Sequence, residues 1–266
     1  MKWKGSLIGA LCVAFVMAGC ATLGPGSVES FEQPVSRQTP TSDALNRARI
    51  HTELGMLYYQ EGRYEVALEE ARIALDASGG YAPAYNLQGL VYMTLRQNAR
   101  AEESFRRALG AARGDPEINN DYGWFLCQSG KVKESLAYFQ VAINNPLFPS
   151  VGLALTRAGI CATKAGNDRQ AEEYLLAALR MDRRSLPAQY WLADIAYRGN
   201  RLPEAQQRMK DLHAQLPEPT AESAWLALRI DRKLGDREGE ARQRGVLGRK
   251  YRDSEQYQKV LRGEFD

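Results

Sequence analysis

The feature that most restricts this chain is a small residue that recurs every 34 positions. The recurrence runs, with a single 36-residue step, through Gly55, Gly89, Gly123, Gly159, Ala193 and Ala227. A second set follows twelve positions after the first: Ala67, Ala101, Ser135, Ala171, Ala205 and Gly239. A period this long indicates one supersecondary unit stacked on copies of itself, because each unit can bury its apolar face only against its neighbours.

Each unit has the pattern of two amphipathic helices. With the recurring residue at position 8, apolar residues are spaced i, i+3, i+4 and i+7 over positions 1–14 and about 17–31. The resulting frames are 48–81, 82–115, 116–151, 152–185, 186–219 and 220–253. The small side chains at positions 8 and 20 predict a close approach of the paired helices. The pattern resembles the tetratricopeptide repeat, which implies an all-α, right-handed superhelical solenoid of six helix-turn-helix units, with 254–266 as a C-terminal cap.

The N-terminus has the features of an export signal. Lys2 and Lys4 precede a short uncharged apolar stretch, so we interpret residues 1–19 as a signal peptide. The run that ends at Cys20 resembles the lipobox of bacterial lipoproteins, which implies cleavage before Cys20 and acylation of this residue. An ordinary signal peptide with an incidental cysteine is the alternative. Ala21 in place of an inner-membrane retention Asp favours a lipid anchor in the outer membrane, on its periplasmic face.

The segment between the anchor and the repeats is rich in Gly, Pro, Ser and Thr. Residues 20–43 lack helical or strand periodicity and contain little apolar surface to bury. We therefore expect the lipidated N-terminus and a flexible tether over 20–43, followed by a repeat domain over 44–266.

The third and fourth repeats depart from a plain repeat. Residues 119–127 read NNDYGWFLC, 144–149 read NNPLFP, and 158–162 read AGICA. The linker is expected to expose Leu147 and Phe148 in a turn. These segments, with the lipobox and the six repeats, are similar to the PilW/PilF family of type IV pilus biogenesis lipoproteins. The resemblance implies a pilotin that binds the pilus secretin subunit and promotes its outer-membrane localisation and multimer assembly.

Two cysteines remain in the folded part of the chain. Cys127 and Cys161 stand at positions 12 and 10 of the first helices of adjacent repeats, which run side by side. In an oxidising compartment this spacing predicts a disulfide between repeats three and four. Two buried, reduced thiols are the alternative.

A peptide-binding groove is expected on the first helices of repeats one to three. Positions 5, 9 and 12 of these helices supply the candidate residues Thr52, Met56, Tyr59, Asn86, Leu90, Met93, Asn120 and Trp124. Asn side chains bind backbone amides, while Met and Trp bury apolar surface, so an extended peptide or a docked helix would fit. Met56, Leu90 and Trp124 could instead pack between repeats.

Other classes of function have little support. His51 and His213 lie in different repeats, so no catalytic triad or zinc site has a candidate set. The net charge of +3, about +1 without Lys2 and Lys4, does not favour nucleic-acid binding. We expect a non-enzyme with no cofactor, metal or small-molecule substrate. The alternative to a pilotin is an adaptor lipoprotein that scaffolds peptidoglycan or outer-membrane protein assembly machinery.

Overall fold

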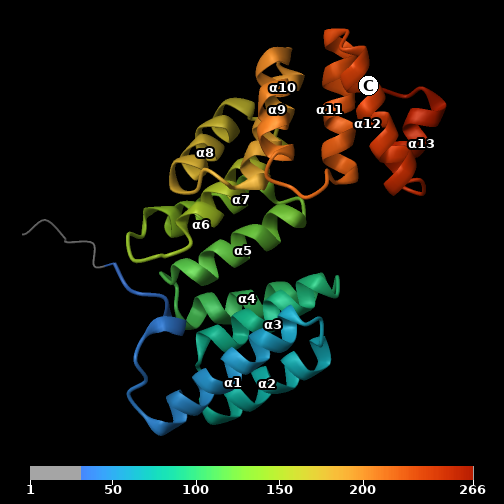
Figure 1. Cartoon of the computed structure of the whole chain (residues 1–266). Helices are drawn as coiled ribbons and strands as arrows, with labels where there is room; N and C mark the ends of the chain where they lie inside the picture. Colours follow the sequence, from blue (N-terminus) through green and yellow to red (C-terminus); the bar gives the residue numbers. More distant parts are fainter. Residues whose placement is uncertain (1–30, 266) are drawn as a thin grey trace, which may run out of the picture. The chain divides into compact units, whose positions relative to one another are not determined.

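The chain folds into successive antiparallel helix pairs stacked side by side (Figure 1). The computed structural model describes residues 31–265, and these contain thirteen α-helices and one 3₁₀ helix, η1. The first helices of the six pairs, called the A helices, are α1 (Asp43–Gln60), α3 (Ala82–Thr94), α5 (Pro116–Gln128), α7 (Val151–Lys164), α9 (Leu186–Arg198) and α11 (Ala221–Leu234). The second, or B, helices are α2 (Tyr64–Ala77), α4 (Asn98–Ala111), α6 (Val132–Asn144), α8 (Asp168–Met181), α10 (Leu202–His213) and α12 (Arg237–Lys250). The remaining elements are η1 (Val35–Arg37) and α13 (Glu255–Arg262).

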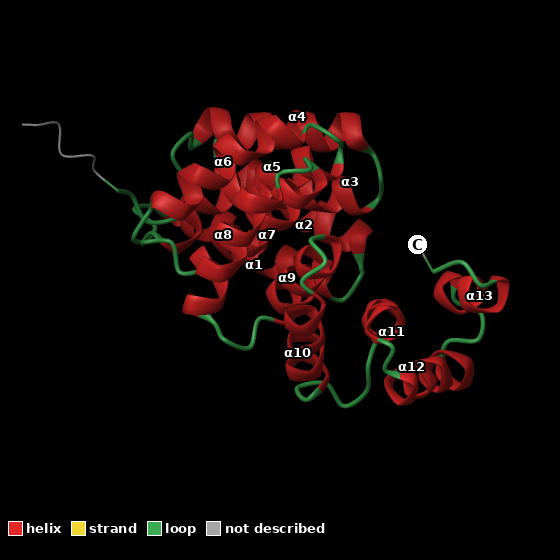
Figure 2. Cartoon of the chain, turned by 90° about the horizontal axis from the view of Figure 1, so that it is seen from above, coloured by secondary structure: helices red, strands yellow, loops and turns green. Residues whose placement is uncertain are grey.

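The A helices lie next to one another along the stack. Each A helix contacts its own B helix and also the A helix of the next repeat. Contacts between A helices therefore run without a break through α1, α3, α5, α7, α9 and α11. Figure 2 gives a second view of this arrangement. The A helices therefore form one continuous face, which we call the A face. The six pairs agree with the frames predicted from the period of the sequence.

Close helix contact explains the small residues at position 8. A Cβ atom added at Gly159 would lie 2.5 Å from Leu175 Cγ in α8, and one added at Gly89 would lie 2.8 Å from Phe105 in α4. Contacts this short cannot form, so a larger residue would force the A and B helices apart. The residues at position 20 are likewise buried in all six repeats. The predicted reason for the recurrence is therefore confirmed.

The turns between A and B helices each contain one residue with a left-handed backbone. Glycine fills this position at four turns, whereas Arg96 (φ 58°) and Asn200 (φ 57°) fill it at the other two. Asn tolerates this conformation, so Asn200 agrees with its local preference. At Arg96 the conformation costs about 1 kcal/mol, so the repeat geometry overrides local preference there.

The C-terminal helix covers the last repeat. Val260 in α13 packs into the cluster that contains Leu228 and Leu247, and the Phe265 ring stacks on Trp225 at a centroid distance of 5.9 Å. Arg229 Nε donates a hydrogen bond to the Phe265 carbonyl (2.9 Å). A solenoid needs such a cap, because its terminal repeat would otherwise expose an apolar face.

The expectation of a flexible tether over 20–43 is wrong for residues 31–43. Residues 31–40, which we call the strap, dock on the first three repeats. The Val35 amide donates to Asp115 Oδ2 (2.6 Å), the Ser36 hydroxyl donates to Glu117, and Asn145 Nδ2 donates to the Glu32 carbonyl (3.0 Å). Val35 also packs on the cluster formed by α1, α2 and α3. The composition of the strap is that of a linker, and its binding partners lie too far along the chain to appear in any local pattern.

The linker between α6 and α7 is also only partly as expected. Leu147 is 44% exposed, but Phe148 is only 5% exposed and packs between Ala142 and Ala154. Asn145 organises the turn, since its Oδ1 accepts from the Leu147 amide (2.9 Å). The exposed-turn prediction is therefore wrong for Phe148, whose ring is buried between α6 and α7.

We predict that Asp115→Ala releases the strap. Asp115 Oδ1 caps α5 by accepting from the Glu117 and Ile118 amides, while Oδ2 holds Val35. The loss should cost about 1–2 kcal/mol of unfolding free energy and should speed tryptic cleavage after Arg37. Denaturant unfolding and limited proteolysis measure the two effects.

Asp236→Ala is the matched control, because Asp236 caps α12 through the Gly239 amide (2.9 Å) and does not contact the strap. This variant should lose stability without faster cleavage after Arg37. An unchanged cleavage rate in Asp115→Ala would show that Asp115 does not hold the strap.

Candidate protein-binding site

The A face of repeats one to three brings the predicted groove residues together, but only half of them are accessible. The predicted residues that are half-exposed are Met56, Tyr59, Met93 and Trp124. The buried ones are Thr52, Asn86, Leu90 and Asn120. The prediction of an open lining is wrong for the buried four. Adjacent A helices pack side by side and cover position 5, which holds Thr52, Asn86 and Asn120, whereas Leu90 at position 9 packs into the core cluster that contains Phe105 and Phe125. We call the accessible four the A-face strip.

The hydroxyl groups at this face are already used within the protein. Thr52 Oγ1 donates to the Ala48 carbonyl one turn earlier (2.8 Å), and the Tyr59 hydroxyl pairs with Thr94 Oγ1 (3.0 Å). Tyr59 is thereby tied to the end of α3. The strip consequently presents mainly thioether and aromatic surface.

A cavity of about 180 Å³ lies at one end of the strip. Thr52, Met56 and Asn86 line it together with Glu117, and Ser36 of the strap closes one side. The strap therefore borders the predicted groove, an arrangement that the sequence does not suggest.

A buried polar network crosses three A helices beside the strip. Asp121 in α5 accepts from Asn86 Nδ2 of α3 (2.9 Å) and pairs with Arg157 Nη1 of α7 (2.8 Å). Asn120 Nδ2 also donates to Asp121 (3.2 Å). A buried pair of this kind ties neighbouring repeats into one geometry. The sequence interpretation missed Asp121 and Arg157, although opposite charges at position 6 of adjacent repeats are a signal that could have identified them.

Two carboxyl groups at the end of the strip near the strap are shielded from solvent. Burial raises the pKa of the Asp115 carboxyl and of the Glu117 carboxyl, and the negative charge of Asp121 adds to both effects. Arg157 offsets the charge of Asp121 itself. The end of the strip near the strap therefore brings three carboxyl groups close together, and only that of Asp121 is paired with a cation.

Two acceptors here have no donor. Asn86 Oδ1 and Asn120 Oδ1 are buried and make no hydrogen bond to any of residues 31–265. An unsatisfied buried acceptor costs about 1–3 kcal/mol. An N–H group that reached either oxygen would recover that cost.

Two cations lie over the ring of Trp124. The Arg157 guanidinium is 5.4 Å and the Lys164 ammonium is 5.8 Å from the centroid of its ring. Cation–π contacts at this range are attractive and hold the indole in place. Trp124 is thus a positioned, half-exposed aromatic side chain, as binding hot spots commonly are.

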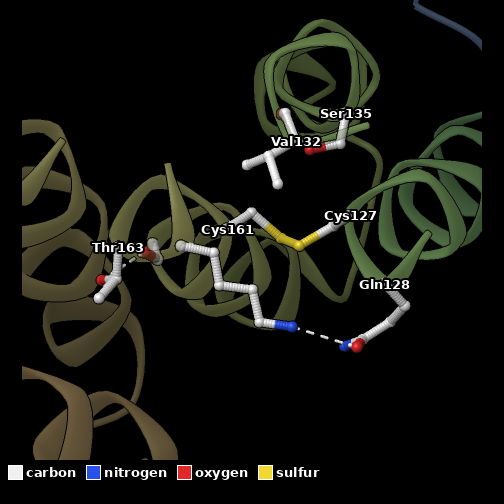
Figure 3. The surroundings of a disulfide bond; sticks show 8 residues. Cys127, Gln128, Val132, Ser135, Cys161 and Thr163 are labelled. Atoms are coloured by element: carbon white, nitrogen blue, oxygen red, sulfur yellow. Dashed lines mark hydrogen bonds between the residues drawn. A yellow bond between two sulfur atoms is a disulfide. The ribbon is translucent and has the colours of Figure 1, made fainter. Parts of the chain in front are cut away.

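The disulfide lies directly behind Trp124. The structure joins Cys127 of α5 to Cys161 of α7, the pair selected from the sequence, with Cα atoms 5.9 Å apart (Figure 3). Both residues are buried against Phe139 and Ala158. Beside the bridge, Lys164 Nζ donates to Gln128 Oε1 (3.1 Å). The third and fourth A helices are therefore connected covalently at the strip.

Groups suited to other chemistry are scattered. His51 pairs with Glu70 (2.7 Å) and His213 with Ser223 (3.1 Å), in different repeats. In the part of the chain that the structure describes, no three His, Cys, Asp or Glu side chains are placed to hold a metal ion. None of the helices there combines the length and apolarity of a bilayer span. The predicted signal peptide and Cys20 lie outside the described residues.

The fold and the A face define the class of this protein. Six stacked helix pairs with small residues at positions 8 and 20 make it a tetratricopeptide repeat protein, and a tetratricopeptide repeat family model matches residues 86–150 and 157–215. Repeats of this class bind other proteins through their helical faces.

Comparison with known proteins gives the family. The chain is 26% identical to the type IV pilus assembly protein PilF of Pseudomonas aeruginosa over 258 residues, which are 97% of this chain and 98% of that protein. The crystal structure of PilW, a widely conserved type IV pilus biogenesis factor, superposes with a TM-score of 0.76 at 31% identity, covering 80% of this chain and 98% of that one. A structure of Pseudomonas aeruginosa PilF gives 0.75 at 26% identity, over 84% and 100% of the two chains. The chain belongs to the family of type IV pilus biogenesis tetratricopeptide repeat proteins that includes PilW and PilF, which confirms the predicted resemblance.

We predict that removing the disulfide destabilises the two central repeats. The bridge closes a loop with a sequence separation of 34 residues. In the chain-entropy description this constraint contributes about 2–4 kcal/mol. The double variant Cys127→Ala/Cys161→Ala should therefore unfold at lower denaturant concentration than the oxidised wild type. Circular dichroism during denaturant titration measures the difference.

Reductant provides the control. Reduced wild type should unfold close to the double variant, and the variant itself should not respond to reductant. Equal midpoints for the oxidised wild type and the double variant would contradict a stabilising bridge.

Proposed function

We propose that this protein is a pilotin of the type IV pilus: an outer-membrane lipoprotein, anchored through acylated Cys20, that binds the secretin subunit and promotes its localisation and multimer assembly. Membership of the PilW and PilF family supports the part of this proposal that concerns pilus biogenesis. The parts that concern the secretin partner and the outer-membrane location rest on the sequence resemblance and on the lipobox. The observation that carries the binding role is the A-face strip.

The strip has the chemistry of a peptide-binding surface. Met56 and Met93 are flexible and polarisable, so they adapt to an apolar partner, while Tyr59 and Trp124 supply rigid aromatic area. The strip is backed by the buried Leu90, Phe105 and Phe125. A partner segment would therefore bind against a preformed core rather than order it.

Two hydrogen-bond acceptors beside the strip could bind the backbone of a partner segment. Asn86 Oδ1 and Asn120 Oδ1 lie on successive A helices and lack donors among residues 31–265. Both oxygens are covered, so a bound chain would reach them only after a small movement of the side chains above them. Backbone N–H groups of an extended secretin segment are donors of the required kind.

We expect alanine variants of the strip to weaken secretin capture. Trp124→Ala should raise the Kd for purified secretin subunit roughly 30-fold, and Met93→Ala by less, because buried aromatic side chains usually contribute most to such interfaces. Surface plasmon resonance gives the affinities, and circular dichroism verifies that the fold is retained.

Met181→Ala is the matched control for Met93→Ala. Met181 is exposed near the end of α8, away from the strip. Its variant should bind secretin like wild type. Wild-type affinity in the Trp124→Ala and Met93→Ala variants would remove the strip from the proposal.

Deletion of the gene distinguishes a pilotin from an adaptor for peptidoglycan or outer-membrane protein assembly. A pilotin is required for the heat-stable secretin multimer and for twitching, so both should be lost while cell shape stays normal. An adaptor for peptidoglycan or outer-membrane protein assembly would instead leave the multimer intact and disturb septation. Immunoblots of unheated and heated membranes, with microscopy, distinguish the outcomes.

A further inference from the structure

We propose that one edge of the solenoid rests directly on a phospholipid surface. This edge, which we call the strap edge, consists of the strap, the α6–α7 loop, the first turn of α7 and the α8–α9 region around Met181. The inference rests on the proposed lipid anchor at Cys20 and adds to it a defined face toward the membrane.

Exposed apolar side chains gather at the strap edge. Phe31 (44% exposed), Leu147 (44%), Leu153 (47%) and Met181 (64%) all lie there. They come from four separate segments, and nothing in the packing of the repeats requires them to be apolar. Exposed apolar residues that cluster in this way usually mark an interaction surface.

The strap edge is continuous. Leu147 and Pro149 line a hollow together with Gln33 and Arg37 of the strap, and Pro149 also lines the next hollow with Leu153 and Met181. The start of the strap, the α6–α7 loop and the end of α8 lie on the same side of the molecule (Figure 1). A flat bilayer surface would therefore meet all of these segments at once.

The charges at this edge suit a phosphate-bearing surface. Arg37, Arg183 and Arg184 are exposed, and none of them forms an ion pair with any of residues 31–265. The acids nearby are Glu32, Asp182 and Glu117, and the charge of Arg37 acts on the Glu117 carboxyl. Asp182 Oδ1 accepts from the backbone amide of Arg184 (2.9 Å). Arginine side chains around apolar ones are the combination that binds lipid headgroups and inserts at their boundary.

The length of the preceding chain brings this edge to the membrane. Because the strap is docked, only residues 21–30 separate Cys20 from Phe31, the first described residue. Eleven peptide steps span at most about 40 Å when fully extended. Acyl chains on Cys20 would therefore keep the strap edge close to the bilayer and raise its local concentration there. The opposite edge, with the turns between A and B helices, would point away.

The test uses the acylated mature protein in vesicles of phosphatidylethanolamine and phosphatidylglycerol. Single cysteines are introduced by Leu147→Cys or Leu95→Cys and labelled with a small environment-sensitive fluorophore, with the native disulfide left oxidised. Leu95 is the matched site, since it is similarly exposed (38%) but lies at a turn between A and B helices. Nitroxide lipids should quench the label at position 147 strongly and the label at position 95 weakly.

A second pair of variants tests the apolar contact itself. Leu153→Asp/Met181→Asp should remove most of the quenching at position 147, whereas the control Leu57→Asp/Leu234→Asp, at exposed residues elsewhere, should leave it unchanged. Flotation of the vesicles reports the anchor independently of the edge.

The outcomes separate this inference from the proposed function. Two results would overturn the strap edge as a membrane contact while leaving the anchor intact. In the first, the protein floats and the labels at positions 147 and 95 are quenched equally. In the second, the protein floats and Leu153→Asp/Met181→Asp does not change the quenching. Failure of the acylated protein to float would overturn the anchor and this inference together. Flotation with quenching confined to position 147 and lost in that variant would support both.

Discussion

The close contact between the two helices of each repeat is the interaction on which the rest of the structure depends. At Gly159 a single added carbon would lie 2.5 Å from Leu175, so the backbone of α7 lies almost directly against the side chains of α8. This contact sets the spacing of one pair, and because every pair repeats it, the A helices align into one face. The strip, the polar network and the disulfide all depend on that alignment.

The third and fourth repeats add specific contacts to this general scaffold. A tetratricopeptide repeat is stable through nearest-neighbour packing alone, yet here Asp121, Arg157 and the Cys127–Cys161 bridge further fix α5 against α7. Trp124 lies beside these contacts, with the Arg157 guanidinium and the Lys164 ammonium over its ring. The part of the protein that departs most from a plain repeat is therefore also the part whose geometry is most constrained, as a binding surface requires.

Much of the fold was predictable, and less of the site was. The six helix pairs follow from the 34-residue period, because every repeat has the same local pattern. The cysteine pair follows from the same period, because Cys127 and Cys161 stand at nearly equivalent positions of adjacent A helices. The accessibility of the groove residues does not follow, since position 5 is buried at Asn86 and Asn120 by the neighbouring A helix. Phe148 appeared exposed because it lies in a proline-rich linker, and its burial depends on space between Ala142 and Ala154.

By itself, the sequence determined the solenoid and its six repeats, because small residues that recur every 34 positions indicate one helix pair stacked on copies of itself. The family was indicated by a resemblance carried by residues 119–127, 144–149 and 158–162 rather than by the period. The tertiary structure decided which side chains remain free on the A face and where the N-terminal segment lies. The hydrogen bonds that dock the strap join residues 80 and 113 positions apart. Contacts at such separations leave no periodic trace in a sequence, so only the folded chain reveals them.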